Sequence, residues 1–252
     1  MAEIQSLARG LKILDILGQA QDGVSITELA ELLGVDKASA SRLVATLVNY
    51  GYAEKDEQTR RFHLGPQVVS LSRSVLARLP MRALAKPFLR QLMERTGECA
   101  HLALPAQGRV LYIDQVESPA TLRVNAEVGT LHPLHCTALG KVLLAFGNLE
   151  LPTPLESFTP HTLTDPDRLR ANLQQVRVQG YAVDDEEFDL GVRCIAVPVF
   201  DFRGKAVGSI GISGPATRVT SERLPGLAAS VVEIGKALSE RMSFIHADSP
   251  AK

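Results

Sequence analysis

Residues 25–65 read SITELAELLGVDKASASRLVATLVNYGYAEKDEQTRRFHLG, a pattern that predicts two short helices followed by a hairpin. We expect Thr27 to cap the first helix, and Gly34 to end it in a left-handed conformation. The chain starts a second helix almost at once, at Asp36. Two short helices joined by so brief a turn must cross steeply, which is the helix-turn-helix arrangement.

The second of these helices has two contrasting faces. Its apolar positions are expected to face inward: Ala40, Leu43, Val44, Leu47 and Val48. The opposite face carries small side chains, hydroxyls and one arginine: Ala38, Ser39, Ser41, Arg42, Ala45, Thr46 and Asn49. Small residues allow close approach to a DNA groove, hydroxyls bond phosphates or base edges, and arginine can fork to guanine. The alternative is a small helix packed against another protein.

The hairpin that follows is predicted as a wing, with strands over 52–55 and 60–64 and a turn over 56–59. Arg60 and Arg61 lie where the chain returns, within reach of a neighbouring phosphate. The alternative is a solvated charged turn. The candidate DNA contacts of residues 1–65 are therefore Thr27, Lys37, Ser39, Ser41, Arg42, Thr46, Arg60 and Arg61.

Apolar periodicity extends on both sides of this segment. Upstream, residues 6–20 place Leu7, Leu11, Leu14 and Leu17 or Ile16 on one helical stripe, and the next helix is expected to bury Leu29, Ala30, Leu32 and Leu33. Downstream, a linker helix over 66–80 carries the seam Val68, Leu71, Val75 and Leu79. Such a seam suits a partner helix, so dimerisation through the linker is favoured over burial on its own domain.

From Cys99 onward the apolar period changes to two, which is typical of strands. Residues 99–118 and 194–214 each predict a hairpin, and TDPDRLRANLQQVRVQG (164–180) predicts a helix capped by Asp165 and ended by Gly180. A final amphipathic helix includes Leu224 to Leu238. Residues 81–246 are thus expected to form an α+β domain, an antiparallel sheet with helices on it, followed by a disordered tail over 247–252.

Residues 131–141, LHPLHCTALGK, leave three readings open. His132, His135 and Cys136 have some of the residue types of a metal site, but adjacent residues diverge and further ligands are lacking. A Cys–His nucleophile needs an orienting group and an oxyanion hole. The reading that needs least is a helix starting near Thr137, whose free N–H groups seat a small anion.

Bulk composition limits the class of protein. The net charge is −1, and residues 1–65 hold seven basic and nine acidic side chains, so DNA binding would need a local patch. Three widely spaced cysteines fit neither a disulfide framework nor a zinc finger. Neither a signal peptide nor an apolar run of about 20 residues is present, so we expect a cytoplasmic protein without a membrane partner.

Several blocks resemble the IclR family of bacterial transcriptional regulators: ASASRLVATLVNYGYAEKD and RRFHLG, then GTLHPLHCTALGKVLLA and YAVDDEEFDLGVRCIAVPVFDFRGKAVGSIGISGP. The resemblance implies a ligand-responsive regulator, such as a repressor, that binds palindromic DNA as a homodimer or dimer of dimers. It also implies a GAF-like effector domain with no catalytic, metal or cofactor site. The residues it assigns to the effector are Val124, Ala138, Leu139, Asp184, Val192, Cys194, Gly211 and Ser213.

The chain departs from this resemblance at Gly211. Relatives that hold small carboxylates tend to carry hydroxyls on alternate residues of the last strand, whereas Gly211 leaves Ser213 alone on that face. Glycine is expected to free room and remove a donor, which suits a bulkier or less polar effector. Two other functions stay open: an enzyme using residues 132–136 with the winged helix as a protein-interaction module, and a constitutive architectural DNA-binding protein.

Overall fold

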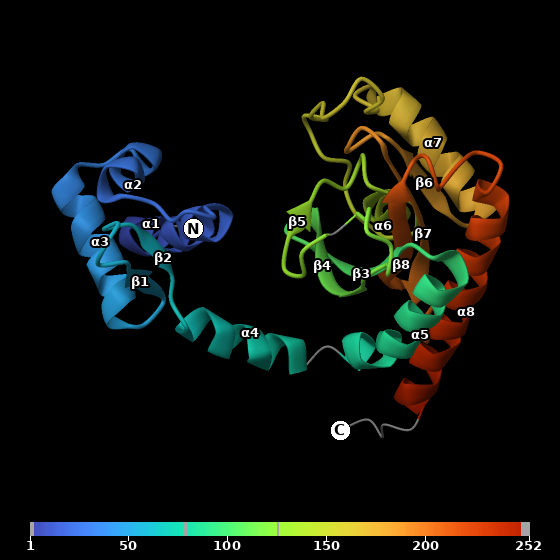
Figure 1. The fold of residues 1–252 in the computed structure, drawn as a ribbon, viewed down its shortest axis with the longest axis horizontal. Helices are drawn as coiled ribbons and strands as arrows, with labels where there is room; N and C mark the ends of the chain where they lie inside the picture. Colours follow the sequence, from blue (N-terminus) through green and yellow to red (C-terminus); the bar gives the residue numbers. More distant parts are fainter. Residues whose placement is uncertain (1–2, 78–79, 125, 248–252) are drawn as a thin grey trace. The chain divides into compact units, whose positions relative to one another are not determined.

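The computed structural model describes residues 3–77, 80–124 and 126–247. The chain divides into two compact units, Met1–Arg78 and Leu79–Lys252, each with its own core (Figure 1). The expected tail beyond residue 247 lies outside the described residues, while Ala247 itself ends a helix. No helix in the described ranges is long and apolar enough to cross a membrane.

The first unit is a winged helix-turn-helix, as predicted. Its elements are α1 (Gln5–Gln19), α2 (Ile26–Leu33), α3 (Lys37–Asn49), β1 (Ala53–Lys55), β2 (Phe62–Leu64) and α4 (Gln67–Ala77). The two strands pair antiparallel with Glu54 opposite His63. The core consists of Ile13, Leu17, Val24, Leu29, Val44 and Ala53.

The helix ends follow the sequence with one exception. Gly34 adopts φ 64°, and its N–H bonds to the last turn of α2. Asp36 caps α3 by accepting the N–H of Ser39. The prediction that Thr27 caps α2 is wrong, because Ser25 is the cap and forms a reciprocal capping box with Glu28.

The predicted apolar stripe of α1 is only partly correct. Leu17 is buried, but Leu7 and Leu11 are 60% and 56% exposed, and Ile13 occupies the core instead. Leu32 of α2 is also exposed, contrary to prediction. Apolar residues occur on more than one side of these helices, so periodicity alone does not identify the face that packs inward.

The linker helix α4 carries exposed apolar side chains. Val69 and Leu71 are exposed, and Val68 is half-buried. Val75 and Leu79 lie outside the residues whose side chains the structure describes. The seam therefore stays a prediction.

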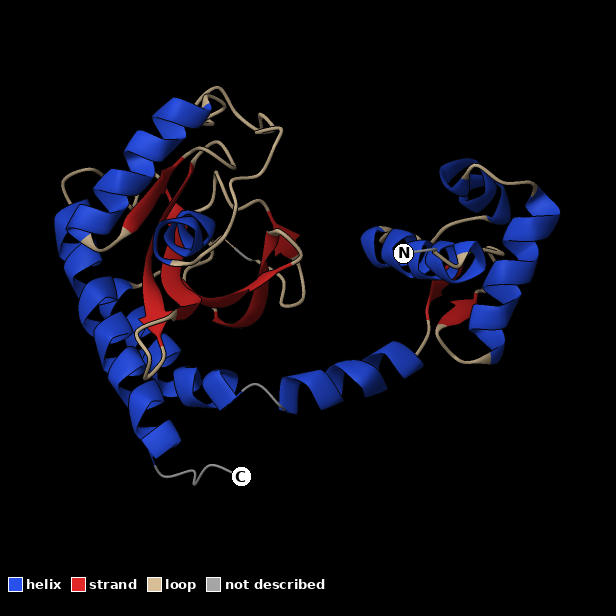
Figure 2. Ribbon diagram, turned by 180° about the vertical axis from the view of Figure 1, so that it is seen from behind, coloured by secondary structure: helices blue, strands red, loops and turns tan. Residues whose placement is uncertain are grey.

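The second unit is a six-stranded antiparallel sheet with helices on both faces, the α+β class that was predicted. The strand order is β5-β4-β3-β8-β7-β6. The strands are β3 (Cys99–Ala106), β4 (Arg109–Val116), β5 (Leu131–His132), β6 (Ala182–Asp185), β7 (Val192–Phe200) and β8 (Ala206–Pro215). Helices α5 (Pro80–Thr96) and α8 (Leu224–Ala247) cover one face, and α6 (Ala138–Phe146) and α7 (Pro166–Gln179) cover the other (Figure 2).

Candidate nucleic-acid interface and ligand site

The exposed face of α3 is held in order by a short chain of hydrogen bonds. Nη2 of Arg42 donates to Oγ of Ser39 at 3.2 Å, and that hydroxyl donates to Oδ2 of Asp36 at 2.7 Å. The capping residue of the helix thus orients the arginine along the face. Ser41, Arg42 and Thr46 are exposed, which is where a groove-binding helix needs them.

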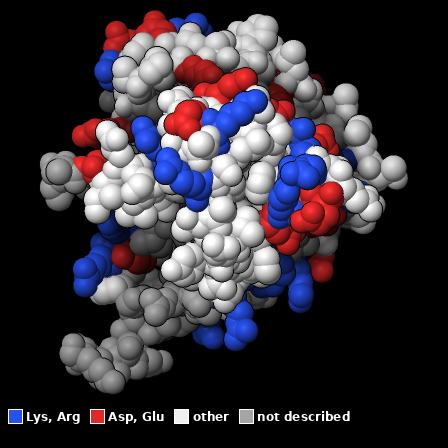
Figure 3. Space-filling model, turned by 90° about the vertical axis from the view of Figure 1, so that its left-hand side faces the viewer, with Lys and Arg blue, Asp and Glu red and all other residues white. Residues whose placement is uncertain are grey.

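The other predicted DNA contacts differ from one another in their exposure to solvent. Lys37 and Arg60 are exposed, whereas Ser39 and Thr27 are half-buried. The hydroxyl of Thr46 donates to the backbone oxygen of Arg42 at 2.9 Å. Figure 3 shows Lys and Arg interspersed with Asp and Glu on one side of the molecule, not a continuous basic surface, which agrees with the near-neutral charge of the chain.

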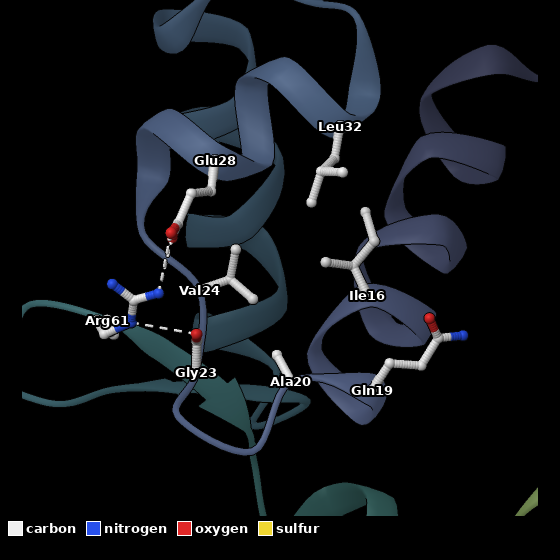
Figure 4. Close-up of a pocket in the computed structure, with 8 residues that line it drawn as sticks. All are labelled: Ile16, Gln19, Ala20, Gly23, Val24, Glu28, Leu32 and Arg61. Atoms are coloured by element: carbon white, nitrogen blue, oxygen red, sulfur yellow. Dashed lines mark hydrogen bonds and ion pairs between the residues drawn. The ribbon is translucent and has the colours of Figure 1, made fainter.

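Arg61 has a structural role that the sequence did not predict. Its Nη2 lies 2.9 Å from Oε2 of Glu28, and its Nε donates to the backbone oxygen of Gly23 (Figure 4). The same Nε also donates to the backbone oxygen of Asp22. Bonds from Ser25, followed by Arg61, lower the pKa of Glu28. Arg61 therefore ties the wing to the start of α2, so its predicted phosphate contact is not supported. Arg60, in the turn with φ 58°, is the exposed arginine of the pair.

In the second unit, four side chains form one line across the sheet. Asp184 of β6 is opposite Cys194, Cys194 is opposite Ser213, and Ser213 is opposite Cys99. Residues opposite each other in a sheet share a face, so these four groups lie together; we call them the polar row. The next line on the same face consists of Ala182, Ala196, Gly211 and His101.

Helix α6 lies over this face. Thr137 caps this helix by accepting the N–H of Gly140, and the helix therefore begins near Thr137, where the sequence predicted its start. Ala138 and Leu139 are buried in the same cluster as Ala182 and Ala196, beside partly buried Cys194. The first turn of α6 therefore lies near the polar row.

The structure brings most of the predicted effector residues together. Val192 lies on β7 two residues before Cys194, and therefore on the same face. Val124 is an exception: it was expected in a strand but lies in the connection between β4 and β5.

Asp184 has an unusual electrostatic environment. Its side chain is almost fully buried, and desolvation raises its pKa to about 7, although the N–H of Glu187 donates to Oδ1 at 2.8 Å. Its carboxyl group also interacts with the thiol of Cys194, whose pKa is raised by burial and by Asp184. The polar row therefore contains a carboxyl group that exists partly in its neutral form near pH 7.

A buried ion pair that the sequence did not reveal lies beside this row. Lys141 of α6 is fully buried, and its Nζ is 2.5 Å from Oε1 of Glu187. The hydroxyls of Thr159 and Thr162 donate to the backbone oxygen of Glu187. Lys141 and Glu187 both lie in segments that resemble the IclR family. Nothing in the spacing of the two residues along the sequence shows that their side chains meet.

The residues of 131–141 have separate environments. His132 contacts the hydroxyl of Thr130 through Nε2, and Nε2 of His135 contacts the backbone oxygen of Glu156, each at 2.9 Å. Burial, then the charge of Asp184, raises the pKa of Cys136 well above its usual range, which disfavours a reactive thiolate. Within the described ranges, no three His, Cys, Asp or Glu side chains gather in a way that would hold a metal ion.

Two details of β8 contradict what was expected of Gly211. A Cβ atom there would lie against the backbone oxygen of Ile195 and 2.8 Å from the Cβ of Ala196, so the glycine permits close strand contact and does not open room. Ser213 is also not alone, because Ser209 follows the same alternation and lies on the same face, fully buried. Ser209 was not among the residues predicted to contact the effector.

Comparison with known proteins supports this architecture along the chain. Residues 6–57 match the IclR helix-turn-helix domain, and residues 73–240 match the family described as bacterial transcriptional regulator IclR C-terminal. The chain is 39% identical over 246 residues to the HTH-type transcriptional regulator BhcR of Paracoccus denitrificans, covering 95% of this chain and 88% of that regulator.

Solved structures show the same fold. A putative IclR transcriptional regulator from Silicibacter sp. TM1040 has a TM-score of 0.81 at 28% identity, covering 94% of this chain and 96% of that one. An IclR homolog from Microbacterium hydrocarbonoxydans, crystallised with 4-hydroxybenzoate, has a TM-score of 0.78 at 21% identity, covering 94% and 98%. At 21% identity, the similarity to the Microbacterium protein is evidence for the fold alone.

A winged helix-turn-helix joined to a second domain of this kind defines a DNA-binding transcriptional regulator. The chain belongs to the IclR family, with an N-terminal DNA-binding domain and a C-terminal effector domain.

Proposed function

We propose that this regulator binds a small organic acid, carboxylic or aromatic, between the first turn of α6 and the polar row, and that binding alters its affinity for an operator. The observation that carries the proposal is the polar row itself: Asp184, Cys194, Ser213 and Cys99 follow one register line across four strands. Helix N-termini favour anions, and the row offers two thiols, a hydroxyl and a partly neutral carboxyl group beside the start of α6.

The DNA-binding half of the proposal rests on α3. Ser41, Arg42 and Thr46 would enter the major groove, with Lys37, Ser39 and Thr27 near the backbone and Arg60 on a flanking phosphate. A homodimer, or a dimer of dimers, would read a palindromic operator whose half-sites lie about one helical turn apart or a multiple of it. The exposed Leu71, a member of the predicted seam on α4, supports pairing through the linker. The protein would act in the cytoplasm.

Ligand binding and DNA binding are coupled if the effector favours one arrangement of the dimer. A difference of about 1–3 kcal/mol in operator affinity between the two arrangements changes that affinity roughly 5- to 150-fold. Differences of this size need no large rearrangement within either unit, because only the spacing of two recognition helices has to change.

The test uses two variants that separate the two halves of the function. Footprinting first locates the operator upstream of neighbouring genes, and organic acids are then screened for their effect on the gel shift. We expect Ser213→Ala to bind the operator normally but to lose the response to the active acid. Arg42→Ala should bind the operator more weakly and keep ligand-induced thermal stabilisation. An unchanged ligand response in Ser213→Ala would contradict the proposed site.

A further inference from the structure

One histidine on the same face of the sheet has polar atoms without protein partners. His101 is fully buried, and among the residues that the structure describes neither Nδ1 nor Nε2 has a hydrogen-bond partner. The hydroxyl of Ser209, also fully buried, is in the same situation. Buried polar groups are nearly always satisfied, so each of these groups requires an explanation.

The strand register places both residues next to the proposed effector site. His101 is opposite Gly211, one line along from Ser213 and Cys99 of the polar row. Ser209 is opposite Ala103, one line further on the same face. The ring of His101 packs edge-on against Tyr112 at 5.5 Å, and that contact continues to His132 and Phe188. His101 thus lies in a wall of rings beside the polar row.

The chemistry of His101 restricts what it can bind. Burial lowers its pKa to about 4, so the ring is neutral near pH 7 and offers one N–H donor and one nitrogen acceptor. A hydroxyl group matches this pair because it also donates and accepts. A second carboxylate would be poorly matched, because the buried Lys141 of this face is already paired with Glu187.

We propose that His101, with Ser209, recognises a hydroxyl group on the effector and makes the regulator selective for hydroxylated organic acids. The inference rests on the proposed function, since it takes the polar row and the first turn of α6 as the place where the acid group binds. His101 is then a specificity-determining residue at the other end of the ligand. Its unsatisfied nitrogens are a cost in the ligand-free protein that the ligand removes.

The test compares two matched pairs of compounds on the full-length protein: 4-hydroxybenzoate with benzoate, and lactate with propionate. Calorimetry and thermal shift would be measured for the wild type, His101→Leu, His101→Asn, Ser209→Ala and Ser213→Ala. We expect the hydroxylated member of at least one pair to bind about tenfold or more tightly than its partner. His101→Leu should abolish this preference, and His101→Asn, which keeps a donor and an acceptor, should restore part of it.

A ligand-free measurement separates this role from a structural one. Leucine removes two unsatisfied buried polar atoms, so His101→Leu should melt no lower than the wild type when no ligand is present. A lower melting temperature, together with equal binding of both members of each pair, would show that His101 holds only an internal water and would overturn the proposal. Ser209→Ala, which removes the other buried polar group without a partner among the described residues, gives the same comparison if the leucine variant fails to fold.

The outcomes also distinguish this inference from the proposed function. If both members of a pair bind equally to the wild type and both are lost in Ser213→Ala, the effector site stands and the role of His101 is refuted. Binding that persists in Ser213→Ala but loses its hydroxyl preference in His101→Leu would support His101 and contradict the polar row. No binding of any of the four compounds to the wild type would refute the assigned ligand class.

Discussion

Nζ of Lys141 lies 2.5 Å from Oε1 of Glu187, and both side chains are almost completely buried. Helix α6 contributes the lysine, and the segment after β6 contributes the glutamate. Because N–H of Glu187 also donates to Asp184, this pair connects the helix, the segment and the polar row. The geometry of the proposed effector site therefore depends on an ion pair that does not belong to it.

Lys141→Met is expected to destabilise the second unit by about 3–5 kcal/mol, because it leaves Glu187 buried without its partner. Urea denaturation followed by circular dichroism would measure the loss. Arg170→Ala is the control, since its ion pair with Asp167 is exposed and should contribute about 1 kcal/mol or less. Similar losses in the two variants would show that the burial of Lys141 has no energetic consequence.

The raised pKa of Asp184, about 7, predicts a dependence of stability on pH. Between the unfolded value, about 3.9, and 7 the folded protein retains a proton that the unfolded chain has released. The contribution of Asp184 to stability is therefore complete below pH about 4 and is lost as pH rises to 7, by up to about 1.4 kcal/mol per unit. Asp184→Asn, which does not titrate, should gain stability relative to the wild type from about pH 4 to about pH 7, and the difference should level off above that. A constant difference between the two proteins would contradict the shift.

Ser25→Ala is expected to destabilise the first unit by about 1 kcal/mol, because it removes the hydroxyl that accepts the backbone N–H of Glu28 at the start of α2. Thr27→Ala should change stability by less than about 0.5 kcal/mol. Hydrogen exchange of the α2 amides would compare them. A larger effect at Thr27 would restore the cap that the sequence suggested.

Arg42→Ala should weaken specific operator binding by about 1–3 kcal/mol while leaving the melting temperature unchanged. Ser39→Ala should have a smaller effect, because it removes only the group that orients the guanidinium. Lys12→Ala, on an exposed position of α1, serves as the control. Wild-type gel-shift affinity in Arg42→Ala would rule out α3 as the recognition helix.

The adjacent arginines of the wing should behave differently when each is changed to alanine. Arg60→Ala is expected to lower affinity for all DNA sequences and to reduce the slope of log affinity against log salt by about 1. Arg61→Ala should instead destabilise the first unit, because it breaks the contacts with Glu28 and Gly23. Salt titrations and melting curves of both variants would decide, and identical behaviour would contradict the assignment.

Local sequence signals were sufficient for the element order and for several ends of helices. Gly34, Asp36 and Asp165 occupy the cap positions that their chemistry predicts. The resemblance assigned Asp184, Cys194 and Ser213 to the effector, but the line that they form across the sheet is known only from the pairing of the strands.

Features that depend on contacts distant in sequence were not predictable. A lysine in a helix is normally taken as exposed, so the burial of Lys141 becomes evident only once Glu187 is placed beside it, 46 residues along the chain. Arg61 was predicted to contact DNA because the sequence does not show its ion pair with Glu28, which is 33 residues away along the chain. His101 lies in an ordinary alternating strand pattern, and it is distinguished by its burial without a hydrogen-bond partner among the residues that the structure describes.

The close contact at Gly211 limits how this regulator can evolve. A single mutation to serine would push a side chain into the backbone of Ile195 and Ala196, so strands β7 and β8 would have to separate before a hydroxyl could be added there. Descendants of this gene that acquire a new inducer are therefore expected to keep the glycine and to vary its neighbours.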